Sequence, residues 1–155
     1  NNYINIYNNL VNLTRNKNLY KNFSSQDTFS DRLIFFMFHF AFFLKVFKKD
    51  NEKKILQEIY DQIFKYLELT IREMGYGDAT INKKMKNYLN TFHSILEQIN
   101  NWESKSNSNK SKVLAVFLNI DKNTSNLIEY FDNYIVDLSN NTLNFYIKGV
   151  VKDKF

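Results

Sequence analysis

The chain has 155 residues, of which 44 % are hydrophobic, and it carries a formal net charge of +5. Its length suits one domain with its own core, its 15 Phe and 10 Tyr exclude a chain that is disordered throughout, and the absence of Cys excludes disulfides, thiolate zinc sites and cysteine nucleophiles. Because Pro is absent and only three Gly occur, helices can form along almost the whole chain, and the positive charge favours anionic partners such as RNA-rich particles or acidic membranes.

The first residues, 1–21, form a weak amphipathic helical pattern, in which Tyr3, Ile6 and Leu10 recur at three- and four-residue spacing. They contain neither an Arg-rich leader nor a secretory apolar region, so we expect any targeting segment to have been removed or to lie outside this sequence. A turn is expected over 23–30, because Ser, Asp and Thr side chains bond readily to nearby backbone groups.

The next helix is expected to begin near Asp31 and to end at about Lys48. Its apolar run over 33–44 would be about 18 Å long, whereas the hydrocarbon core of a bilayer is about 30 Å thick. Arg32 and Lys45 flank the run. We therefore expect a helix that is buried on all sides in the protein core, and a membrane-dipping segment is the alternative.

The clearest amphipathic helix spans 51–74, where an apolar residue recurs at every fourth position. These positions are Ile55, Ile59, Ile63, Leu67 and Ile71. Gly75 can close this helix in the left-handed backbone conformation, and Gly77 gives the loop a second permissive point. Asp78 or Thr80 is expected to cap the next helix, which should pack antiparallel to the first across the short loop.

That second long helix has an apolar face over 81–99 and a cluster of Lys in its first turns. The segment 103–112 is rich in Ser, Asn, Lys and Glu and is predicted to be a solvated, mobile loop. Short helices are expected over 113–120 and 124–138, and Gly149 is expected to stop a last helical turn.

The predicted fold is therefore one compact all-α domain of about six helices over 1–155, and it carries no catalytic signature. No Ser-His-Asp pattern, glycine-rich phosphate loop, HExxH helix or pair of catalytic carboxylates is recognisable. His39 and His93 lie on different predicted helices, and both are interpreted as hydrogen-bonded core residues. We expect a binding protein rather than an enzyme, with no metal site, no cofactor and no small-molecule substrate.

The densest group of polar signals is the stretch IREMGYGDATINKKMK, residues 71–86. It resembles the signature of the ubiquinol-cytochrome c chaperone family, in which a helix ends in Arg-Glu-Met-Gly and is followed by Gly-Asp and a basic helix start. Upstream, residues 19–47 are similar to the family's segment in which Asp-Thr precedes an Arg and then an apolar helix with a His. The matching residues are Asp27, Thr28, Arg32 and His39.

The two matching segments follow the family's order and spacing and cover about half the chain. Tyr76 stands where the family has a small aliphatic residue. Of the family's Phe-Tyr-Gly group on the following helix only Phe92 is kept, with His93 and Ser94 after it.

The resemblance implies a helical, non-catalytic assembly factor that binds newly made cytochrome b and promotes assembly of the cytochrome bc1 complex, complex III. It implies the mitochondrial matrix or the matrix face of the inner membrane, with an alphaproteobacterial cytoplasm as the alternative. The implied partners are cytochrome b as client, a small helical partner subunit and the ribosome near its tunnel exit. We expect the partner-binding residues to be Asp27, Thr28, Arg32, Arg72, Glu73, Gly75, Gly77, Asp78, Lys83 and Lys84.

The sequence without the family resemblance is also compatible with two other functions. The charge of +5 and the cluster of Lys83, Lys84 and Lys86 suit an RNA-binding or ribosome-binding protein, whose affinity would fall steeply with salt. The apolar run over 33–44 suits a protein that binds the membrane surface.

Overall fold

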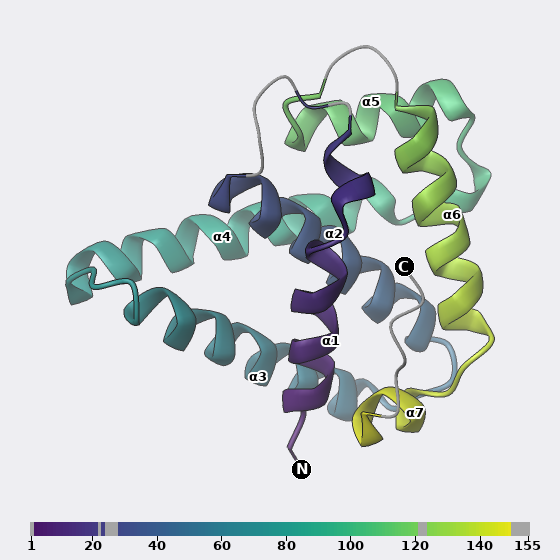
Figure 1. Cartoon of the computed structure of the whole chain (residues 1–155). Coiled ribbons are helices and arrows are strands. Elements are labelled where there is room, and N and C mark those ends of the chain that lie inside the picture. Colours follow the sequence, from purple (N-terminus) through teal and green to yellow (C-terminus); the bar gives the residue numbers. More distant parts are fainter. Residues whose placement is uncertain (1, 22, 24–27, 121–123, 150–155) are drawn as a thin grey trace.

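The computed structural model describes residues 2–21, 23, 28–120 and 124–149. In these residues it contains seven α-helices, two short 3-10 helices and no strand, which confirms the predicted all-α fold (Figure 1). The α-helices are α1 (Ile4–Thr14), α2 (Phe29–Phe47), α3 (Lys53–Arg72), α4 (Asp78–Ile99), α5 (Asn107–Phe117), α6 (Ser125–Ser139) and α7 (Leu143–Lys148). The 3-10 helices are Lys17–Tyr20 and Trp102–Ser104.

Helix α2 lies at the centre of the fold and is covered by α1, α4 and α6 (Figure 1). It begins earlier than expected, because the Thr28 hydroxyl accepts a hydrogen bond from the Asp31 backbone N–H at 3.2 Å and so caps the helix at Phe29. Eleven of its 19 residues are buried, including its central phenylalanines. The predicted core helix is confirmed, and the alternative of a membrane-dipping segment is wrong because these side chains face neighbouring helices. No helix in the described part of the chain is both long and apolar enough to span a membrane.

His39 is buried in α2 and makes two hydrogen bonds, as interpreted from the sequence. Its Nδ1 lies 2.6 Å from the Phe35 carbonyl oxygen and its Nε2 lies 2.6 Å from the Tyr130 hydroxyl on α6. A carbonyl can only accept, so Nδ1 carries the proton and Nε2 accepts from the tyrosine. Burial lowers the pKa of His39 from 6.5 to about 4, so the ring is neutral at physiological pH.

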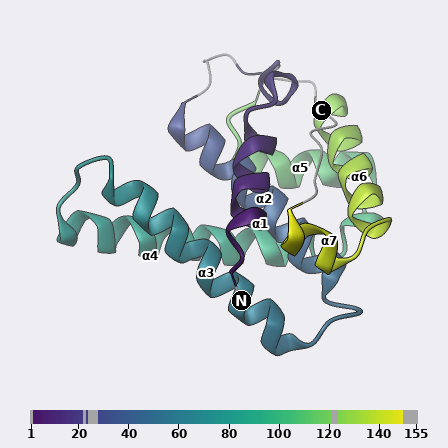
Figure 2. The ribbon, with the colours of Figure 1, turned by 60° about the horizontal axis from the view of Figure 1, so that its bottom comes forward.

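Helices α3 and α4 form the predicted antiparallel pair. Their apolar faces meet near Phe64 and Phe92, whose ring centroids are 5.0 Å apart. Figures 1 and 2 show that the end of α3 and the start of α4 extend beyond the other helices. We call this projecting part the arm and residues 69–84 the arm tip.

The segment 103–112, predicted as a mobile loop, is mostly helical. After the short 3-10 helix, α5 begins at Asn107, where the Ser106 hydroxyl accepts a hydrogen bond from the Asn109 backbone N–H at 3.2 Å. The helix expected over 113–120 is thus longer at its start and ends at Phe117. The prediction of a loop was wrong because Ser and Asn are as typical of helix starts as of loops.

A buried polar group holds α5 against α6 near this point. The indole N–H of the fully buried Trp102 donates to Asp132 at 2.8 Å, and the Lys110 ammonium lies 3.1 Å from the same carboxylate. Lys110 also lies over the Trp102 ring, 5.3 Å from its centroid. A lysine in a polar segment therefore belongs to the interior here.

The two ends of the described chain lie against each other. The 3-10 helix after α1 completes the helical start predicted over 1–21. Gly149 has a φ of +75° and ends α7, which confirms its predicted role. The Asn5 side-chain amide donates to the Ile147 carbonyl at 3.1 Å, and α7 packs on α1.

The buried His39 predicts a pH-dependent stability. Its folded pKa of about 4 lies below the ordinary value of 6.5, so the unfolded chain binds a proton that the folded chain does not between these pH values. Stability from this group is present above pH 6.5 and is lost as the pH falls towards 4, by about 3 kcal/mol at most. Urea denaturation across this window should show a shallower pH slope for His39→Gln than for the natural chain.

If His39→Gln has the same slope as the natural chain, the buried, neutral state assigned to His39 is wrong.

Candidate partner-binding site

The arm tip is built around one glycine turn. Gly75 has a φ of +94°, and its backbone N–H bonds to the Arg72 carbonyl at 3.0 Å, so it ends α3 in the left-handed conformation as predicted. Gly77 instead has a φ of −73° in an extended backbone that any residue can adopt. The tight turn thus depends on one of the two glycines.

Arg72 joins the two helices of the arm by ion pairs. Its guanidinium lies 2.5 Å from the Asp78 carboxylate across the loop and 3.5 Å from Glu68, one turn earlier on α3. The hydrogen bond with Asp78 raises the pKa of Arg72, so this side chain stays charged. Both ion pairs are exposed to solvent, so they contribute little to the stability of the fold.

The prediction that Asp78 or Thr80 caps α4 is wrong. Gly77 occupies the N-cap, where no side chain bonds to the helix, and Asp78 is the first helical residue. The Arg72 guanidinium is within reach of the Asp78 carboxylate and offers it a charged partner. The carboxylate still lies at the positive end of the α4 dipole, which favours its charge.

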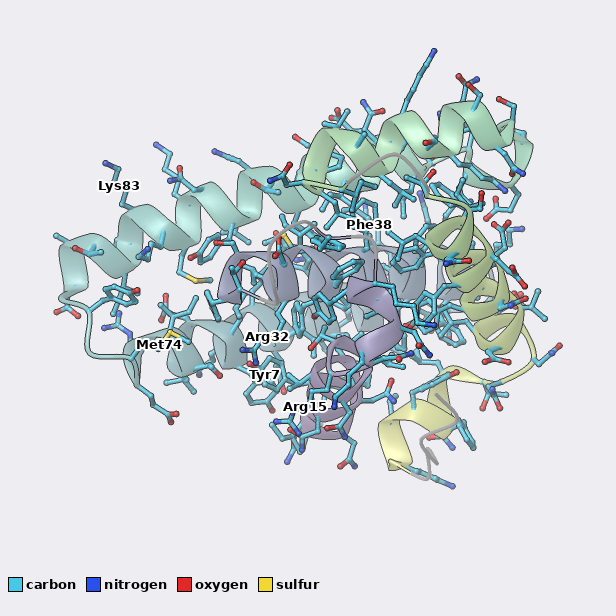
Figure 3. The ribbon with its side chains drawn as sticks, turned by 45° about the horizontal axis from the view of Figure 1, so that its top comes forward. Tyr7, Arg15, Arg32, Phe38, Met74 and Lys83 are labelled. Atoms are coloured by element: carbon cyan, nitrogen blue, oxygen red, sulfur yellow. The ribbon has the colours of Figure 1, made fainter. Side chains whose placement is uncertain are left out.

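The arm tip also exposes large apolar side chains. Leu69 is 49 % exposed, Met74 48 % and Tyr76 45 %. Lys84 lies over the Tyr76 ring at 4.7 Å from its centroid, while Lys83 points away from the arm into solvent (Figure 3). The tip therefore combines apolar area with charges of both signs, as protein-binding surfaces do.

The α3 side of the arm is fastened to α1 at Thr70, beside the exposed Leu69. The Tyr7 hydroxyl lies 2.8 Å from the Thr70 hydroxyl, and the Tyr7 ring packs on Tyr66 of α3 and on Phe36 of α2, with centroids 5.5 and 5.6 Å apart. Burial, opposed by the Thr70 hydrogen bond, raises the pKa of Tyr7. The contact with α1 thus holds the first residues of the arm tip, while Met74 and Tyr76 beyond it stay exposed.

The predicted site residues fall into separate places. Seven lie together on the arm tip: Arg72, Glu73, Gly75, Gly77, Asp78, Lys83 and Lys84. Thr28 and Arg32 belong to the start of α2 and not to the arm. Asp27 lies outside the described residues. Sequence reasoning missed the exposed Leu69, Met74 and Tyr76 as site residues. Leu69 was missed because it occupies a helix whose other leucines and isoleucines face the core.

His93 differs from its interpretation as a core residue. It is exposed, and its Nε2 shares a 3.0 Å hydrogen bond with the Tyr60 hydroxyl of α3. Phe92 takes the core position, and the next residue on a helix points about 100° away. Across the described ranges, no three His, Asp or Glu side chains gather as a metal site would need.

The fold and the arm define a helical protein with a projecting, partly apolar and charged arm. The family model for ubiquinol-cytochrome C chaperones matches residues 21–123, a range that includes α2, α3, α4, α5 and the whole arm. The chain belongs to this ubiquinol-cytochrome c chaperone family, and a chaperone role in the assembly of complex III follows. Comparison with curated proteins and with solved structures gave no match.

The two glycines of the arm predict opposite effects of the same substitution. Gly75→Ser places a Cβ in a left-handed conformation and should lower the free energy of unfolding by about 1–2 kcal/mol. Gly77→Ser needs no change of backbone, meets no atom within 4 Å and adds a capping hydroxyl, so it should raise stability by about 0.5–1 kcal/mol. Chemical denaturation of both variants measures this, and equal effects would contradict the described turn.

Proposed function

We propose that this chain is a non-catalytic chaperone that binds newly made cytochrome b through its arm tip and promotes its assembly into complex III. The observation that carries the proposal is the exposed apolar and charged surface at the end of the arm, inside the part of the chain that matches the family. Seven of the residues expected from the sequence to bind a partner surround this surface: Arg72, Glu73, Gly75, Gly77, Asp78, Lys83 and Lys84.

The chemistry of the tip suits an apolar client. Leu69, Met74 and Tyr76 offer area whose removal from water is worth about 25 cal/mol per Å². Methionine and tyrosine adapt to irregular apolar surfaces, and tyrosine keeps a polar end. The flanking charges would fix the orientation of the client more than its affinity.

The hydrogen-bond partners of the two histidines support a non-catalytic role. Each bonds to a tyrosine hydroxyl, His39 to Tyr130 and His93 to Tyr60, and not to a serine or threonine that could act as a nucleophile. Arg72 and Asp78 pair with each other across the loop, as structural ion pairs do.

For location we propose the mitochondrial matrix or the matrix face of the inner membrane, with an alphaproteobacterial cytoplasm as the alternative. A small helical subunit and the ribosome near its tunnel exit are proposed as further partners. The net charge of +5 and the exposed Lys83 and Lys86 support a contact with an RNA-rich particle.

The apolar tip residues give a direct test of client binding. The triple variant Leu69→Ser, Met74→Ser and Tyr76→Ser should capture newly translated cytochrome b about tenfold less well, because it removes most of the apolar contact area. Its melting temperature should change little, since these side chains are exposed. Pull-down of the client with purified variants measures the effect.

Matched controls come from other exposed apolar residues. Val116 and Val136 are 68 % and 56 % exposed, so Val116→Ser with Val136→Ser should leave capture unchanged. Arg72→Ala with Asp78→Ala tests the charges of the tip. If the controls lose as much as the triple variant, or if capture collapses between low and moderate salt as direct RNA binding would, the tip is not an apolar client site.

A further inference from the structure

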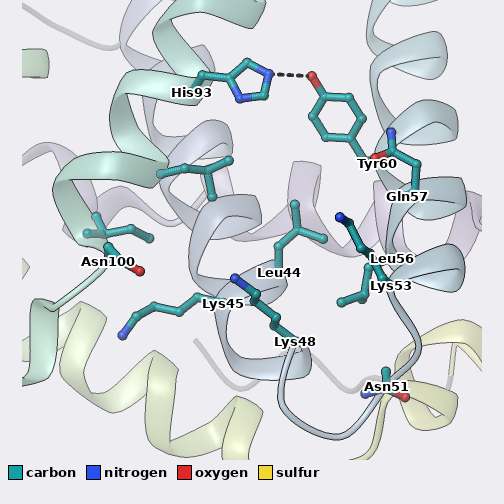
Figure 4. Close-up of a pocket in the computed structure, with 12 residues that line it drawn as sticks. Leu44, Lys45, Lys48, Asn51, Lys53, Leu56, Gln57, Tyr60, His93 and Asn100 are labelled. Atoms are coloured by element: carbon teal, nitrogen blue, oxygen red, sulfur yellow. Dashed lines mark hydrogen bonds between the residues drawn. The ribbon is translucent and has the colours of Figure 1, made fainter.

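A groove lies at the other end of the α3 and α4 pair from the arm tip. It has a volume of about 790 Å³ and is bounded by the end of α2, the start of α3 and the end of α4 (Figure 4). This volume falls within the range of small-molecule sites in proteins, which is about 300–1,000 Å³. The groove is separate from the proposed client surface.

The floor of the groove is apolar. It is formed by Leu44 from α2, Leu56 from α3, and Leu96 with Ile99 from α4. Leu44 and Leu96 are only partly buried, so apolar area remains open to the groove. A water-soluble ligand alone would leave this floor uncovered.

The rim of the groove is positively charged. Three lysines line it and no Asp or Glu does. Lys45 forms an ion pair with Glu103, whereas among the described residues no ion pair is formed by Lys48 or Lys53. In Figure 4 the ammonium groups of Lys48 and Lys53 extend over Leu44 from the two sides of the groove.

The position of Lys53 strengthens this charge. It lies in the first turn of α3, which has no acidic residue, so its ammonium adds to the positive end of the helix dipole. Glu52 at the N-cap of α3 is exposed and does not line the groove, so the groove side of this end carries positive charge. The opposite wall of the groove is polar, because Tyr60 and His93 bond to each other there.

We propose that this groove binds one acidic phospholipid, with its phosphate between Lys48 and Lys53 and one acyl chain along the leucine floor. Both halves of such a molecule find a complementary surface here: the anion meets two ammonium groups and the chain covers the apolar area. An apolar protein helix would bury the lysines without partners, at a cost in desolvation, and free phosphate would leave the floor in contact with water. The inference does not depend on the client of the arm.

Calorimetry with soluble lipids tests the groove. The probes are dihexanoyl phosphatidylglycerol, dihexanoyl phosphatidylcholine and glycerol phosphate, each below any micelle-forming concentration and each titrated into the full chain. We expect the phosphatidylglycerol to bind at least about tenfold more tightly than the other two, because phosphatidylcholine brings a choline cation to the lysines and glycerol phosphate has no acyl chain to cover the floor.

Two double variants of equal charge separate this site from general attraction to a basic protein. Lys48→Gln with Lys53→Gln should weaken phosphatidylglycerol binding by about tenfold. Lys49→Gln with Lys54→Gln changes neighbouring exposed lysines that do not line the groove and should leave binding unchanged. Circular dichroism melts of both variants establish that they fold.

Equal losses in the two double variants would overturn the proposal, and so would equal binding of the two lipids. Glycerol phosphate binding as tightly as the lipid would show a phosphate site without an acyl site. Lack of binding by all three probes would also reject it.

Discussion

The arrangement of the other helices depends on helix α2, because its apolar side chains leave it with no face that can be exposed to water. Its phenylalanines point in every direction around the helix axis, and Phe35, Phe38, Phe40 and Phe42 are all fully buried. Each unburied phenylalanine would cost about 1.5–3 kcal/mol, so α1, α4 and α6 must enclose α2 together. The ends of α3 and α4 that form the arm are not needed for this enclosure. They pack on each other, and their outer surface is left for a partner.

Enclosing such a helix brings polar groups into the interior, and two sets of these are paired between helices. His39 reaches across to Tyr130 on α6, and the Trp102 indole shares the Asp132 carboxylate with Lys110. A paired polar group gives little net stability but penalises any other arrangement of the helices, since its partner would be left buried and unsatisfied. These pairs thus fix how the helices are placed relative to one another, around a core of phenylalanines that could otherwise pack in many ways.

The strongest predictions from the sequence came from elements whose signal is local. Periodic isoleucines predicted α3, and a glycine at the end of this pattern predicted the turn at Gly75. The errors arose where a distant residue decides the outcome. Asp78 could cap its own helix or pair with Arg72, and in the structure it pairs with Arg72. The sequence around Lys110 is typical of a surface segment, but the fold brings Asp132 and Trp102 beside this lysine. For the site, the charged residues at the loop were predictable, but the exposure of Leu69 and the separation of Arg32 from the tip depend on how the helices pack.

We propose that the client contacts the arm tip and not the enclosed body. A photo-reactive amino acid placed at Met74 can be compared with one at the more exposed Val116 in cells or organelles that synthesise cytochrome b. We expect a cross-link between position 74 and newly made cytochrome b and none from position 116. A cross-link from position 116 without one from position 74 would contradict it.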